Sequence, residues 1–134
     1  MAVLKYEMHT LRSSEDVVAV RQMVRQWAVS DGFSLVDQTK IVTAASELAR
    51  NALQYGNGGE AKLEALNDGA RRGLRLTFED QGPGIVDTQL ALRDGYSTGG
   101  GLGLGLSGAR RLSNEFALDS EPGRGTRVMI ARWK

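Results

Sequence analysis

The densest run of glycines in the chain constrains its folding more than any other feature. Five of the seven residues from 99 to 105 are glycine. Glycine loses the most conformational freedom on folding and weakens helix and strand interiors, so this tract is expected to form a loop. A second glycine pair, Gly82 and Gly84, follows Asp80 directly after a strand-like run. The two stretches together predict a pocket built from backbone groups and one carboxylate.

A third stretch lies upstream, where Glu47 and Asn51 stand four residues apart in a helical pattern. Side chains at i and i+4 project from the same side of a helix, so the carboxylate and the amide are expected to point into one space. Asparagine has a low helix propensity, so its presence in the interior of a predicted helix indicates a role other than helix formation. Taken alone, such a pair is more often a surface contact than a site, but three stretches in fixed order are far more specific.

Length and composition indicate an ordinary globular protein. The 134 residues, of which 41% are apolar and 25% charged, fit one domain spanning residues 1–134. A net charge of +1 gives no general attraction to nucleic acid or membranes. The absence of cysteine excludes disulfides, thiolate metal sites and cysteine nucleophiles. Since the sequence has neither a signal peptide nor an apolar run of membrane length, we expect a cytoplasmic protein that binds neither nucleic acid nor membrane.

Two helices are expected in the first half of the chain. A capping box at residues 13–16 precedes the first helix, which Ser30-Asp31-Gly32 ends, and a second capping box at residues 34–37 opens a long helix that ends at Gly56. The second helix carries Glu47 and Asn51. Arg21 and Arg25 lie on the first helix, opposite its apolar stripe. Most such arginines are simply solvated, and the alternative is a face that docks a partner.

Alternating apolar and polar residues predict the strands. Residues 3–9 alternate as a half-buried strand would, residues 61–65 and 74–78 predict an antiparallel hairpin, and residues 116–118 and 126–133 predict a terminal hairpin. Between the hairpins we expect at most a short helix within residues 85–93 and then a helix from Leu104 to Asn114. This order predicts an α/β two-layer sandwich, a mostly antiparallel sheet with helices on one face.

The three stretches have a coherent chemistry for a site that binds Mg-ATP. Asp80 can accept a hydrogen bond from an exocyclic amine, which selects adenine over guanine, while Gly82 and Gly84 let the backbone turn tightly beside the base. The glycine tract and the start of the helix after it can offer N–H groups to phosphate oxygens. Asn51 can supply a neutral oxygen to Mg²⁺, and Glu47 is placed to take a proton from an attacking hydroxyl or water.

Two other nucleotide-binding motifs are rejected. Residues 103–108 match the dinucleotide fingerprint, but they follow a polar loop instead of a strand, and the helix leads into an antiparallel hairpin. None of the lysines follows a glycine in the way that a P-loop requires.

Three motifs of the chain resemble the N, G1 and G2 boxes of the GHKL ATPase/kinase superfamily: Glu47-x-x-x-Asn51, Asp80-x-Gly82-x-Gly84 and Gly101-x-Gly103-x-Gly105. The resemblance covers most of the chain and implies the Bergerat, or histidine-kinase-like, ATPase fold. Gly125-Thr126 is similar to the Gly-Thr of that family, in which the threonine contacts the adenine region. Within the superfamily, the chain is most similar to the RsbT-type switch serine/threonine kinases and anti-sigma regulatory factors of bacterial partner-switching systems.

The resemblance implies site residues, a catalytic activity and partners. Glu47 is implied as the catalytic residue and Asn51 as the metal ligand. The positions implied to bind ATP or ADP are Asn51, Asp80, Gly82, Gly84, Ile85, Gly99, Gly100, Gly101, Leu102, Gly103, Leu104, Gly105 and Thr126. The activity implied is that of a Mg-ATP-dependent serine/threonine kinase of a stressosome, which phosphorylates STAS-domain antagonist or scaffold proteins and, when released, activates a downstream phosphatase.

Two other functions stay open. An anti-sigma factor would bind and sequester a sigma factor in its ATP-bound state. The ATPase part of a histidine kinase is a weaker alternative, because the sequence has no phosphoacceptor helix and His9 is its only histidine.

Overall fold

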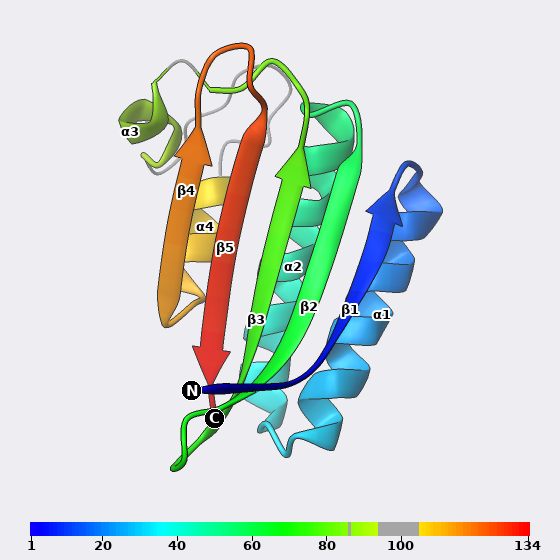
Figure 1. Ribbon diagram of the computed structural model, residues 1–134, viewed down its shortest axis with the longest axis vertical. Coiled ribbons are helices and arrows are strands. Elements are labelled where there is room, and N and C mark those ends of the chain that lie inside the picture. Colours follow the sequence, from blue (N-terminus) through cyan, green and yellow to red (C-terminus); the bar gives the residue numbers. More distant parts are fainter. Residues whose placement is uncertain (86, 94–104) are drawn as a thin grey trace.

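The computed structural model describes residues 1–85, 87–93 and 105–134, in which a five-stranded antiparallel sheet has helices packed on one face (Figure 1). The strand order is β1-β2-β3-β5-β4. Figure 1 shows α1, α2 and α4 behind the sheet, while the front of the sheet carries no described helix. This architecture confirms the predicted two-layer sandwich.

The strands pair antiparallel with their neighbours throughout the sheet. They are β1 (Ala2–Leu11), β2 (Gly59–Asn67), β3 (Arg72–Asp80), β4 (Glu115–Ser120) and β5 (Thr126–Trp133). Because β3 pairs with β5, Asp80 lies opposite Thr126 at one end of the sheet, and Gly73 lies opposite Trp133 at the other. The turn of the C-terminal hairpin therefore lies beside the end of β3.

Side-chain caps begin both long helices, as the capping boxes predicted. Ser13 Oγ accepts a hydrogen bond from the Asp16 N–H at 3.2 Å before α1 (Ser14–Ser30). Ser34 Oγ accepts one from the Asp37 N–H at 3.2 Å before α2 (Leu35–Gln54). The short helices are α3 (Thr88–Ala91) and α4 (Gly105–Arg111). No helix in the described part of the chain is long and apolar enough to cross a membrane.

The hydrophobic core lies between the helices and the sheet. Val20 and Val24 of α1, Ile41 and Leu48 of α2 and Leu76 of β3 belong to one buried cluster. Full burial of an aliphatic side chain of this size stabilises the fold by about 1.5–3 kcal/mol. This packing holds α2 against the sheet, and with it the segment that carries the candidate catalytic residue.

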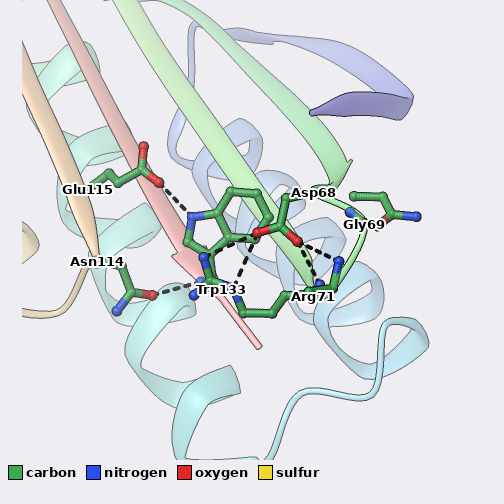
Figure 2. Close-up of polar contacts among 8 residues, drawn as sticks. Asp68, Gly69, Arg71, Asn114, Glu115 and Trp133 are labelled. Carbon is green, nitrogen blue, oxygen red and sulfur yellow. Dashed lines mark hydrogen bonds and ion pairs between the residues drawn. The ribbon is translucent and has the colours of Figure 1, made fainter.

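Trp133 fixes the end of the sheet that lies away from Asp80 (Figure 2). Its indole N–H donates to Glu115 Oε2 at 2.6 Å, and its backbone N–H donates to Asn114 Oδ1 at 2.7 Å. The Arg71 guanidinium lies over the ring, 4.8 Å from the centroid. Gly73 leaves room for the ring, since a Cβ at this position would lie 2.6 Å from Trp133 Cε3. These contacts join the β2–β3 turn to β4 and β5.

The predicted burial of the first strand was wrong. β1 forms as expected, but its large apolar side chains stay between 45% and 62% exposed, namely those of Val3, Leu4, Tyr6 and Met8. Among the described strands, β1 is an edge strand that pairs with β2 alone, and only its last residue, Leu11, is buried in the core.

The end of the last helix was also predicted wrongly. The helix expected to reach Asn114 ends at Arg111. The Asn114 N–H donates to the Ala131 carbonyl at 2.9 Å, so this residue has already joined the sheet. Tertiary pairing overrides the helical pattern at these positions.

Candidate functional site

Asp80 ends β3 with its side chain buried, at 9% exposure. Its Oδ1 accepts a hydrogen bond from the Gly82 N–H at 2.9 Å, and the Thr126 backbone N–H also donates to the carboxylate. Burial raises the pKa of the Asp80 carboxyl above its ordinary value, and the two N–H donors oppose this shift. Asp80 is thus a carboxylate held in place by backbone groups on two sides, as a residue that recognises a base requires.

Glycines pack closely around this carboxylate. A Cβ at Gly56 would collide with the Asp80 carboxyl group, and a Cβ at Gly82 would lie 2.5 Å from the Gly56 Cα. Gly125 has a φ of 81°, and a Cβ there would collide with the Asp80 carbonyl oxygen. The backbone can approach Asp80 this closely only because these residues lack side chains. We refer to Gly56, Gly82 and Gly125 as the glycine cradle.

Ser120 joins the loop after Asp80 to the C-terminal hairpin. Its Oγ accepts a hydrogen bond from the Ile85 N–H at 2.9 Å and donates to the Gly125 carbonyl at 2.9 Å. It also lies 2.8 Å from Thr126 Oγ1. The sequence prediction missed Ser120, because its position opposite Thr126 follows from the β4–β5 register and no local motif marks it.

The second anchor of the same loop is a backbone contact. The Gly123 N–H donates to the Pro83 carbonyl at 2.7 Å. Gly84 has a φ of 77°, and a Cβ there would collide with the Glu121 carbonyl oxygen. The structure therefore brings the predicted residues Asp80, Ile85 and Thr126 together in one cluster.

Glu47 and Asn51 lie one turn apart on α2, and both are half-buried. Glu47 Oε1 accepts a hydrogen bond from Arg50 at 3.0 Å. The backbone carbonyl of Asn51 accepts hydrogen bonds from the N–H groups of Tyr55 at 2.9 Å and of Gly56 at 3.3 Å. Because Gly56 also contacts Asp80, the C-terminal end of α2 adjoins the glycine cradle.

Most of the glycine tract lies outside the described residues. The positions concerned are Gly99, Gly100, Gly101, Leu102, Gly103 and Leu104. Gly105 begins α4, which packs against α2. On α4, the Ser107 side chain is 1% exposed and its hydroxyl has no hydrogen-bond partner in the described structure.

The residues present fit an adenine nucleotide. A buried carboxylate offers an acceptor for the adenine amine, and the glycine cradle gives close access to the backbone. Within residues 1–85, 87–93 and 105–134, no cluster of three or more His, Cys, Asp or Glu could hold a metal ion. Mg²⁺ that arrives on phosphates keeps several waters as ligands and needs few from the protein, so it does not require a cluster of this kind.

Comparisons with known proteins identify the family of this chain. The family model described as "Histidine kinase-, DNA gyrase B-, and HSP90-like ATPase" matches residues 36–134, a range that contains Glu47, Asn51, Asp80 and Thr126. Serine/threonine-protein kinase RsbT of Bacillus subtilis (strain 168) is 48% identical over 118 residues. That match covers 88% of this chain and 89% of the Bacillus protein.

Two solved structures share the fold. In the RsbU and RsbW domains of Rv1364c from Mycobacterium tuberculosis, the match has a TM-score of 0.68 and 22% identity, and it covers 97% of this chain and 33% of that one. In the SiaB–SiaC complex from Pseudomonas aeruginosa, it has a TM-score of 0.55 and 14% identity, and it covers 98% and 91%. At these identities the likeness concerns the fold alone.

Proposed function

This chain belongs to the histidine kinase-, DNA gyrase B- and HSP90-like ATPase family and, within it, to the RsbT-type serine/threonine kinases, and from this premise we propose that it phosphorylates a STAS-domain partner with Mg-ATP. The partner would be an antagonist or scaffold protein of a cytoplasmic stressosome. Release from that partner would leave the kinase free to activate a downstream phosphatase.

The buried Asp80 carboxylate in its glycine cradle is the observation that carries the proposal. A carboxylate accepts hydrogen bonds and does not donate them when ionised, so it pairs with the amine of adenine and disfavours the carbonyl that guanine has at the same position. Gly82 and Thr126 hold the carboxylate through their backbone N–H groups. A rigid acceptor at this end of the sheet supports ATP as the phosphate donor.

Glu47 is our candidate for the general base. The acceptor hydroxyl oxygen attacks the γ-phosphorus, the bond to the β–γ bridging oxygen breaks, ADP leaves with the electron pair, and Glu47 takes the hydroxyl proton. Arg50 binds one oxygen of Glu47, and the other has no partner among the described residues. Bound Mg²⁺ would offset the charge of the phosphates, and Asn51 would be its ligand from this chain.

The identity to a serine/threonine kinase over most of both chains supports protein phosphorylation in particular. That relative, RsbT of Bacillus subtilis, is a serine/threonine-protein kinase. The same family also contains ATPases that act on no protein hydroxyl, so nucleotide binding alone does not test the proposal.

The test is direct phosphorylation with a purified partner. The chain is incubated with Mg-ATP and each STAS-domain protein of the source cell, and mass spectrometry locates the phosphate. We expect phosphate on one serine or threonine of one partner, and transfer slower by about 10²–10⁴-fold with the Glu47→Ala variant. Failure to modify any STAS-domain protein, combined with direct capture of a sigma factor by the ATP-bound chain, would establish the anti-sigma alternative instead.

A further inference from the structure

A groove between α1 and α2 contains both Glu47 and the two arginines that the sequence marked as a candidate docking face. The cavity measures about 470 Å³ and is lined by Arg21, Gln22 and Arg25 of α1 and by Thr43, Ser46 and Glu47 of α2, among others. The sequence predicted the arginines as a possible docking face for a partner and Glu47 as the catalytic residue that receives the partner's hydroxyl. The structure places both at one opening.

The two arginines of the groove have no partner among the residues that the structure describes. Arg21 and Arg25 are exposed, and neither makes an ion pair or side-chain hydrogen bond with the residues that the structure describes. Other arginines of the chain are paired, for example Arg75 with Glu64 and Arg132 with Asp37. Like charges at i and i+4 repel each other on a helix, so Arg21 and Arg25 lower the stability of α1 slightly. An anion bound between them would offset this repulsion.

The groove is electrically asymmetric. Its α1 wall carries two positive charges, while its α2 wall carries the Glu47 carboxylate. A segment with a neutral hydroxyl beside a carboxylate fits this pattern in one orientation, with the carboxylate toward the guanidinium groups and the hydroxyl toward Glu47. The reverse orientation would set two carboxylates against each other.

We infer that this groove docks the phosphoacceptor segment of the partner, and that this segment carries an acidic side chain close to the serine or threonine that receives phosphate. The inference rests on the proposed function for the role of Glu47. To that function the inference adds the residues that bind the substrate protein, and it specifies an acidic segment as the kind of substrate that they select. Arg21 and Arg25 act as specificity residues and make no contact with the nucleotide.

The first test measures phosphorylation kinetics with the STAS-domain partner that the experiment above identifies as the substrate, in its unmodified form. Arg21→Gln and Arg25→Gln should each raise the KM for the partner about tenfold and leave kcat and ATP affinity unchanged, because a charge-assisted contact in docking is lost. Arg12→Gln, which removes an exposed arginine outside the groove, is the matched control and should change neither constant. An unchanged KM in both groove variants, or a loss of ATP affinity in them, would overturn the docking role.

A second test does not need an active kinase. A short fluorescein-labelled peptide with a central serine flanked by glutamates should bind the ATP-loaded chain at low salt, and the same peptide with glutamines should bind about tenfold more weakly. The preference should disappear in Arg21→Gln and Arg25→Gln but persist in Arg12→Gln. Equal binding of the two peptides would refute the acidic specificity. If the chain preferred the acidic peptide but phosphorylated no partner, the proposed kinase function would be refuted and the docking role of the groove would stand.

Discussion

The carboxyl group of Asp80 packs against the backbone of Gly56, so that the end of β3 contacts the chain just beyond α2. The Gly56 N–H in turn donates to the carbonyl of Asn51 at 3.3 Å. Two consecutive contacts, both through Gly56, thus connect Asp80, which would read the base, with Asn51, which would hold the metal. The binding of a nucleotide that spans Asp80 and Asn51 therefore depends on how the end of β3 packs against the chain that follows α2.

Replacement of Asp80 by asparagine should weaken ATP and ADP binding. The substitution keeps the size of the side chain but turns one acceptor oxygen into a donor that faces the adenine amine, which costs about 1–3 kcal/mol. Calorimetry should show this loss, and GTP should bind weakly to the unchanged chain. Glu79→Gln, at the exposed neighbouring position, is the control and should bind ATP normally. Equal affinity for GTP and ATP would contradict the assignment of Asp80 to adenine.

Nucleotide affinity should fall on acidification. Burial raises the pKa of the Asp80 carboxyl, so the group takes up a proton at a higher pH than an exposed aspartate does. Folding favours the protonated form of Asp80 over the ionised form. At neutral pH, where the group is ionised, its burial therefore lowers the free energy of unfolding. This penalty decreases as the pH falls from the raised pKa towards the ordinary pKa of an aspartate. ATP binding, which needs the ionised acceptor, should weaken over the same interval. Titration calorimetry at several pH values should show this step in the unchanged chain and not in Asp80→Asn.

Glu47 and Asn51 should separate chemistry from binding. Glu47→Ala should keep nucleotide affinity near normal and slow phosphoryl transfer by about 10²–10⁴-fold, the usual contribution of a general base. Asn51→Ala should weaken Mg-dependent nucleotide binding instead. Single-turnover transfer and calorimetry with and without Mg²⁺ distinguish the two effects. Full transfer activity in Glu47→Ala would remove its assignment as the base, since positioning alone can carry much of a phosphoryl transfer.

Gly56→Ala should damage both folding and nucleotide binding. The added Cβ would collide with the Asp80 carboxyl, so the carboxylate or the end of α2 must move. Forced shifts of this kind in a packed region cost about 1–3 kcal/mol. Gly108→Ala is the control, since outside its own helix no atom of the described residues lies within 4 Å of a Cβ there and alanine favours the helix. Urea unfolding and ATP titration of both variants check the prediction, and wild-type values for Gly56→Ala would show that the cradle tolerates a side chain.

Glu64→Gln should destabilise the protein without affecting nucleotide binding. Glu64 lies on the open face of the sheet at 6% exposure, where it accepts hydrogen bonds from Arg75 at 2.8 Å and 3.0 Å. Those bonds lower the pKa of the Glu64 carboxyl. Loss of the charge leaves a half-buried guanidinium without its partner, and we expect a loss of about 1–3 kcal/mol in urea unfolding. Asp68→Asn, in an exposed ion pair with Arg71, should change stability by less than about 1 kcal/mol.

The sequence by itself determined the elements and the local chemistry of the site. Capping boxes and helical spacing predicted α1 and α2, and the i, i+4 spacing placed Glu47 and Asn51 on one face of α2. Alternation predicted the β2–β3 hairpin and placed Asp80 at the end of its second strand. These features depend on neighbours within a few residues, so periodicity and turn residues suffice to reveal them.

Only the tertiary structure decided how these pieces meet. The insertion of β5 between β3 and β4 puts Thr126 opposite Asp80 and lets Ser120 hold Ile85. The packing of α1 on α2 brings Arg21 and Arg25 to the opening where Glu47 lies. Strand order and helix packing are set by contacts between residues far apart in the chain, and local patterns, which predicted the two hairpins, do not specify how the hairpins and helices pack together.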